Sequence, residues 1–117
     1  MEPLTAAFAA LRKQGFIARQ RFSCCSGCAG SELATYVGEM PAAKRAKVRG
    51  VVFYTRQDFA NKSKFLHIKY GPVDSAKVGK VGLPTVEVGQ AVFEALRAAG
   101  LNPEWDGSPD KTIIVEA

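Results

Sequence analysis

The spacing of apolar residues along the chain predicts three helices. Leu4, Phe8 and Leu11 lie at positions i, i+4 and i+7, which places them on one face of a helix over residues 3–14. Two later stretches repeat this period, and each is closed by a proline or a glycine. Their apolar positions are Leu33, Tyr36, Val37 and Met40, and then Val88, Val92, Leu96 and Ala99.

Other stretches follow the two-residue period of a strand. Apolar and polar residues alternate over 16–22 and 64–70, and the apolar run 50–55 predicts a further strand. Residues 101–105 and 111–116 flank the turn sequence Asp-Gly-Ser-Pro-Asp, which predicts a hairpin. The predicted element order is therefore α-β-α-β-β-α-β-β.

This order predicts an α+β fold, a two-layer sandwich in which the helices cover one face of a sheet of about five strands. The chain of 117 residues is the size of one domain, so we expect residues 1–117 to form a single unit. Residues 41–50 are basic and predicted to be solvated, and residues 72–85 show no period and are predicted to be loop. The expected core consists of Phe8, Leu11, Phe22, Leu33, Val37, Val52, Leu66, Ile68, Val92, Leu96 and Trp105.

Composition narrows the class of protein. Apolar residues make up 47% of the chain and charged residues 23%, which is typical of a globular protein. No apolar run approaches the ~18–20 residues that span a bilayer. The N-terminal sequence Met-Glu-Pro-Leu-Thr lacks the basic start of a secretory signal. We therefore expect a cytoplasmic protein that contacts no membrane.

Charge is distributed unevenly along the chain. Residues 1–80 hold fourteen Lys/Arg and five Asp/Glu, a net charge of +9, whereas residues 81–117 hold two and six, a net charge of −4. Such asymmetry can favour nucleic acid, an acidic protein partner or head-to-tail association into a homo-oligomer. The alternative, which the lack of a basic stripe favours, is an ordinary soluble surface whose charges are scattered in three dimensions. The basic run Lys44, Arg45, Lys47 and Arg49 comes with no base-reading motif, so any nucleic-acid binding should be weak and non-specific.

The three cysteines, Cys24, Cys25 and Cys28, fall within five residues, between a predicted strand and a predicted helix. A Cys-x-x-Cys pair at a helix start is typical of redox dithiols, because the helix N-terminus lowers the thiol pKa. The Leu-Pro-Thr-Val sequence 83–86 resembles the proline loop of thioredoxins. In a reducing compartment the same thiols can simply pack a tight corner.

Two further interpretations of the cysteines stay open. Zinc takes four N or S ligands, and these thiolates lack a second ligand pair, with His67 the only histidine. His67 is also the only imidazole base for a cysteine nucleophile, and it is predicted to lie on the exposed face of its strand. We expect no cofactor, with zinc as the alternative.

Two polar clusters next to aromatic residues are candidate binding surfaces. The first leaves the predicted strand 50–55 and comprises Tyr54, Arg56, Gln57 and Asp58. The second is Trp105 with Asp106, beside a turn. Both have structural alternatives, because Asp58 can cap a turn and a tryptophan often belongs to the core.

Four motifs resemble a bacterial family of domains of unknown function, and the similarity covers about residues 4–115. They are Phe-x-x-Leu-Arg (Phe8 to Arg12), Phe-x-Cys-Cys-x-x-Cys (Phe22 to Cys28), Phe-Tyr-x-x-Gln-Asp (Phe53 to Asp58) and Gly-Leu-x-x-x-Trp-Asp-Gly (Gly100 to Gly107). The resemblance implies a compact α+β domain and supplies no activity or substrate. Members of that family often carry a histidine where this chain has Thr55.

These observations favour a non-enzymatic module that binds another macromolecule, most readily a protein, of the immunity or phage accessory type. The alternative is a redox or metal-binding protein that uses Cys24, Cys25 and Cys28.

Overall fold

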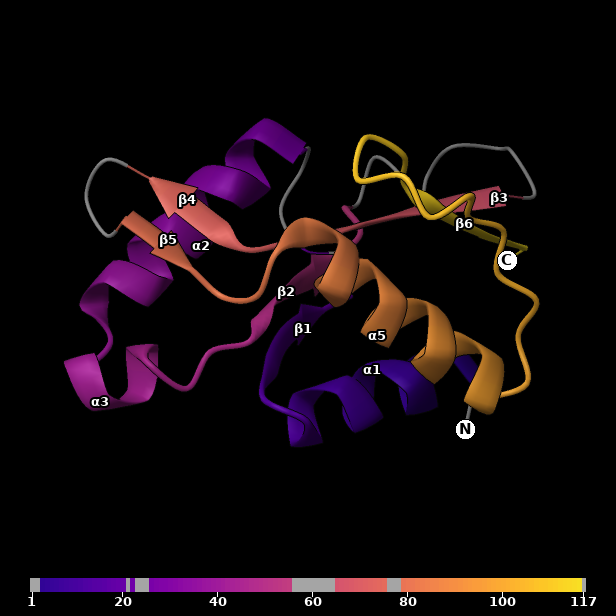
Figure 1. Ribbon diagram of the computed structural model, residues 1–117, viewed down its shortest axis with the longest axis horizontal. Helices are drawn as coiled ribbons and strands as arrows, with labels where there is room; N and C mark the ends of the chain where they lie inside the picture. Colours follow the sequence, from indigo (N-terminus) through magenta and orange to yellow (C-terminus); the bar gives the residue numbers. More distant parts are fainter. Residues whose placement is uncertain (1–2, 21, 23–25, 56–64, 76–78, 117) are drawn as a thin grey trace.

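The computed structural model describes residues 3–20, 22, 26–55, 65–75 and 79–116 (Figure 1). Its larger sheet contains β1 (Phe16–Arg19), β2 (Gly50–Phe53), β3 (Phe65–Gly71) and β6 (Ile113–Glu116). Its smaller sheet contains β4 (Val73–Ser75) and β5 (Gly79–Val81). The helices are α1 (Pro3–Lys13), α2 (Ser26–Glu39), α3 (Ala42–Arg45) and α5 (Thr85–Ala98). The predicted α+β class is confirmed.

The strands of the larger sheet follow the order β1-β2-β3-β6. β1 and β2 are parallel, with Phe16 opposite Gly50 and Arg19 opposite Phe53, whereas the other two pairings are antiparallel. Parallel neighbours need a crossover connection, and α2 and α3 lie on the segment that supplies it. The carboxyl ends of β1 and β2 therefore lie side by side.

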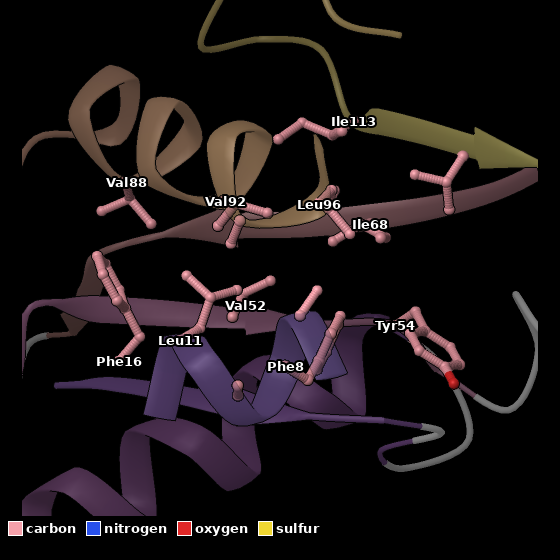
Figure 2. Packing of buried hydrophobic residues seen from close by; sticks show 14 of the residues in the cluster. Phe8, Leu11, Phe16, Val52, Tyr54, Ile68, Val88, Val92, Leu96 and Ile113 are labelled. Atoms are coloured by element: carbon pink, nitrogen blue, oxygen red, sulfur yellow. The ribbon is translucent and has the colours of Figure 1, made fainter. Parts of the chain in front are cut away.

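α1 and α5 cover one face of this sheet and enclose the main core (Figures 1 and 2). Figure 2 shows Phe8 and Leu11 from α1 pointing toward Leu96 of α5, with strand residues between them. All three of these side chains are 0% exposed. The main core cluster consists of Ala7, Phe8, Leu11, Phe16, Ala18, Val52, Tyr54, Leu66, Ile68, Val88, Val92, Ala95, Leu96, Ile113 and Val115.

A second, smaller core lies on the opposite face of the sheet. Its buried members are Ile17, Leu33, Val37, Val48, Val51, Phe53 and Val73. α2 and the β4–β5 hairpin therefore pack on the face that α1 and α5 leave uncovered, which differs from the predicted two layers. The reason is that β1 and β2 are apolar on both faces, so each face needs a cover. All of the predicted core residues belong to one of the two clusters or pack against it.

Two predicted connections differ from the structure. The segment 72–85 was predicted as loop, but it contains the paired strands β4 and β5. The predicted hairpin of 101–105 with 111–116 is reduced to a single antiparallel bridge between Glu104 and Ile114, because β6 pairs with β3 instead. No helix in the described part of the chain is long and apolar enough to cross a membrane.

Candidate functional site

The parallel pairing brings together the starts of two predicted site segments. The cysteine segment follows β1 and the Tyr54 segment follows β2, and the Phe22 amide donates a hydrogen bond of 2.8 Å to the Tyr54 carbonyl. α2 begins at Ser26, which places the Cys28 backbone in its first turn. Cys24 and Cys25 lie outside the described residues, as do Arg56, Gln57 and Asp58.

Tyr54 supports this strand end from inside the protein. Its side chain is 2% exposed, and its ring meets the Phe8 ring edge-on at 5.8 Å. Its hydroxyl donates to Gln20 Oε1 at 3.2 Å, and Gln20 Nε2 in turn donates to Thr5 Oγ1 at 3.3 Å. Tyr54 therefore ties β2 to α1, and a partner has no access to its ring.

The proline loop of residues 83–86 lies beside the entry of β2. The Leu83 amide donates to the Arg49 carbonyl at 2.8 Å, which fixes Pro84 near the amino end of β2. The cysteines follow the carboxyl end of β1, next to the carboxyl end of β2. The thioredoxin comparison stays a prediction, because Cys24 and Cys25 lie outside the described residues.

Trp105 and Asp106 hold a turn. Trp105 Nε1 donates to the Ser108 carbonyl at 3.1 Å, and the Ser108 amide donates to Asp106 Oδ1 at 2.8 Å. The indole meets the Tyr70 ring edge-on at 5.6 Å, and the Tyr70 hydroxyl donates to the Lys111 carbonyl at 2.6 Å. These contacts give both members of the predicted binding pair a structural role.

The rings at this turn pack against α5 at Gly89. A Cβ on Gly89 would lie 2.7 Å from both Trp105 Cζ2 and Tyr70 Cε2, so only a glycine lets the two rings approach the helix this closely. Burial raises the pKa of the Tyr70 hydroxyl above its ordinary value, and the charges of Asp106 and Asp110 add to the increase.

His67 lies on the exposed face of β3, as predicted. Its Nδ1 is 2.9 Å from Thr112 Oγ1, a neighbour on the segment that enters β6. Within the described part of the chain, no three His, Cys, Asp or Glu residues gather in a way that could hold a metal ion. The metal hypothesis for the cysteines stays a prediction.

α3 and β5 lie at one end of the long axis (Figure 1, left), and the basic residues Arg45 and Lys80 line one hollow between them. Arg45 closes the carboxyl end of α2 there. Its Nε donates to the Val37 carbonyl at 3.1 Å, and its Nη2 donates to the carbonyls of Gly38 at 3.1 Å and Met40 at 2.9 Å. The last carbonyls of a helix lack amides four residues on, and Arg45 supplies donors to them, so it acts as a C-terminal cap; the Val37 carbonyl also accepts the Met40 amide at 3.2 Å.

Arg49 plays a similar part at the turn between α1 and β1. Its Nη1 donates to the Gln14 carbonyl at 3.2 Å, and its guanidinium lies 5.0 Å from the centre of the Phe16 ring. The Arg49 amide also donates to the Gly15 carbonyl at 3.1 Å. Gly15 has a φ of 101°, a conformation that favours glycine.

The lysines of this surface differ from its arginines. Lys13, Lys44, Lys47 and Lys80 are exposed and form no ion pair with any described residue. We call the surface made by Lys44, Lys47 and Lys80 with Arg45 and Arg49 the basic end. Glu32 and Glu39 on α2 and Asp74 on β4 are the acidic residues of these two neighbouring elements. The run 44–49 is visible in the sequence, whereas only the fold brings Lys80 beside Arg45.

A family model described as "Domain of unknown function (DUF6891)" matches residues 1–117. The chain belongs to this family. The match covers the Trp105–Gly107 turn and the cysteine segment alike. No curated protein and no solved structure gives a significant match.

Proposed function

We propose that this protein of the DUF6891 family is a non-enzymatic module that binds another protein, and that the basic end is its contact surface. The observation that carries the proposal is the set of exposed lysines at one end of the molecule, none of which is paired with a described carboxylate. Concentrated charge of one sign accelerates and orients association with a partner of the opposite sign.

Arg45 and Arg49 hold the backbone of this surface in place. Arg45 fixes the junction of α2 with α3, and Arg49 fixes the segment that follows α3 against the turn after α1. The backbone that carries Lys44 and Lys47 is therefore held before a partner arrives. A preorganised surface loses less conformational entropy on binding, which favours a specific contact.

A protein partner fits this surface better than nucleic acid. Proteins that hold single strands combine cations with aromatic rings on which bases stack. At the basic end the aromatic ring beneath Arg49 belongs to Phe16, which is 3% exposed and cannot receive a base. Nucleic acid would gain only phosphate contacts here, which weaken steeply with salt.

The test is affinity capture from a lysate of the source organism, followed by quantitative mass spectrometry. The bait variant is Lys44→Glu/Lys47→Glu, and the matched control is Arg97→Glu/Lys111→Glu, which changes the charge equally at positions outside the basic end. We expect a captured protein that the bait variant loses and the control retains, with both variants folded. Capture that both variants retain, or that nuclease treatment abolishes, would contradict the proposal.

We further propose a bacterial or phage-encoded protein of the reducing cytoplasm, of the immunity or accessory type. The size of the two core clusters supports this, because the domain needs no disulfide to fold. Self-association is an alternative use of the basic end. The lysate capture would reveal it as recovery of untagged copies of the chain.

Thiol chemistry is the second candidate function, and the position of α2 favours it. The helix begins immediately after Cys25, and its free amide groups stabilise a nearby thiolate. We expect alkylation at about pH 6.5, followed by peptide mapping, to label Cys25 before Cys24. Labelling of Cys24 first, or of neither residue, would refute this candidate. Elemental analysis of the purified protein tests the zinc alternative.

A further inference from the structure

A hollow of about 320 Å³ lies on the sheet face that carries the second core, between α2, β2 and the corner that leads from β3 into β4. It exposes more apolar than polar surface. The larger apolar side chains that line it are buried members of the second core, so they form its floor: Leu33, Val51, Phe53 and Val73. The hollow shares no residue with the basic end.

α2 leaves this hollow open at Gly30. The glycine lines the hollow, and a Cβ at this position would meet nothing within 4 Å. Ala34, one helical turn further on, also lines the hollow and contributes only a methyl group. Glycine inside a helix is unfavourable, so a larger residue at position 30 would stabilise α2. It would also occupy the opening that the glycine leaves.

Two opposite charges border the same hollow. Lys69 of β3 and Asp74 of β4 both line it. Asp74 is exposed, and its carboxylate forms no ion pair with any residue that the structure describes, Lys69 included. Lys69 has an interaction of its own, but an ammonium group has three donors and can bind a further carboxylate. One ligand in the hollow can therefore meet a cation and an anion together.

We infer that the hollow binds a free α-amino acid that has an apolar side chain. The side chain covers the floor, the α-ammonium group meets Asp74 and the α-carboxylate meets Lys69. An amino acid carries both charges on the carbon that bears its side chain, so one small molecule satisfies all three features. An amine or a carboxylic acid with the same apolar body satisfies only two. This inference goes beyond the proposed function and uses none of its residues.

The volume restricts the ligand to a small one. A cavity of about 150 Å³ holds benzene, so a hollow of about 320 Å³ takes an aromatic ring with a short polar head. It lies at the lower limit of the volumes usual for ligand pockets, ~300–1,000 Å³, which is too small for a dinucleotide. Phe53 in the floor favours an aromatic ligand, because two rings can pack edge-on or offset. L-Phenylalanine is therefore the probe.

The experiment is an NMR titration of the full chain, in which the amide shifts of Val51, Phe53 and Val73 report the site. The ligands are L-phenylalanine, L-alanine, 3-phenylpropionate, which lacks the ammonium group, and phenethylamine, which lacks the carboxylate. Gly30→Leu fills the opening, and its matched control is Ser31→Leu at the next residue of α2, exposed and outside the lining.

A second pair of variants tests the charges. Asp74→Asn removes the anion at the hollow, and Asp110→Asn makes the same change of charge at an exposed position outside it. Ion pairs at such exposed positions are weak, so we expect L-phenylalanine to bind about three to five times more tightly than 3-phenylpropionate or phenethylamine. Asp74→Asn should abolish its preference over 3-phenylpropionate, whereas Asp110→Asn should retain it.

We expect L-phenylalanine to bind with a dissociation constant of about 1 mM, and about tenfold more tightly than L-alanine because its ring covers the floor. Gly30→Leu should abolish this binding and Ser31→Leu should retain it. Equal affinity for L-phenylalanine and L-alanine, binding that Gly30→Leu retains, or unchanged shifts at about 50 mM ligand would overturn the inference. Either single-charge analogue binding as tightly as L-phenylalanine would overturn it as well. None of these results bears on the basic end.

Discussion

Gly89 in α5 offers the sharpest test of the packing described above. In the middle of a helix, replacing glycine by alanine normally stabilises by up to ~1 kcal/mol, because alanine loses less backbone entropy. At this position the new Cβ would lie 2.7 Å from atoms of the Trp105 and Tyr70 rings, whereas ordinary contacts begin at 3.4 Å. The rings must therefore move by several tenths of an ångström.

Neither ring can move freely. The Trp105 indole donates to the Ser108 carbonyl at 3.1 Å, and the Tyr70 hydroxyl donates to the Lys111 carbonyl at 2.6 Å. Overpacking of this kind costs about 1–3 kcal/mol, which exceeds the gain in helix propensity. We therefore expect Gly89→Ala to lower the free energy of unfolding by about 1–2 kcal/mol, measured by urea denaturation.

The matched control is Gly30→Ala in α2. A Cβ there meets nothing within 4 Å, so only the propensity term acts and the free energy of unfolding should rise by up to ~1 kcal/mol. If both substitutions stabilise the protein equally, Trp105 and Tyr70 do not pack on α5 as described. The structural role assigned to the Trp-Asp-Gly motif would then be wrong.

Three further predictions follow from the same structure. Leu96→Ala should cost ~2–5 kcal/mol in urea unfolding, because this side chain is 0% exposed, and a loss below ~1 kcal/mol would show α5 to be peripheral. Arg45→Ala should destabilise by about 1–2 kcal/mol because it removes three hydrogen bonds to carbonyls at the C-terminal end of α2, whereas Lys44→Ala should change little; equal effects would exclude the capping role. Near-ultraviolet titration should place the pKa of Tyr70 above 10.0, assigned by its loss in Tyr70→Phe. Because the folded pKa is raised, its contribution to stability is complete below the unfolded pKa and is lost as the pH rises through the folded pKa; an unshifted titration would contradict the burial.

The sequence predicted the elements that have a strong period of their own. α1 and α5 carry apolar residues at helical spacing over at least ten residues, so their ends were found to within a few positions. β4 and β5 were missed because each has three residues and depends on α2 for cover, which local pattern does not reveal. The pairing of β6 with β3 rather than with 101–105 is likewise a long-range choice.

The roles of the candidate site residues also depend on long-range packing that the local sequence does not show. The local sequence around an aromatic residue beside a polar turn does not show whether the ring faces a partner or the core. Only the fold shows that Tyr54 and Trp105 pack inward. The basic run 44–49 was visible in the sequence. The sequence does not show that the arginines of this run have structural roles and the lysines do not. The carbonyls that accept hydrogen bonds from Arg45 and Arg49 lie in the segment that ends α2 and in the turn after α1, which are distant in sequence from the run or lie before it.

Site-specific photo-crosslinking in cells of the source organism tests the central claim most directly. A photoreactive residue in place of Ala46 lies in the basic end, and the same residue in place of Lys111 lies on the exposed turn before β6, outside the basic end. We predict a covalent adduct with one acidic protein from position 46 and none from position 111. An adduct only from position 111, an adduct with nucleic acid, or none at either position would contradict the account.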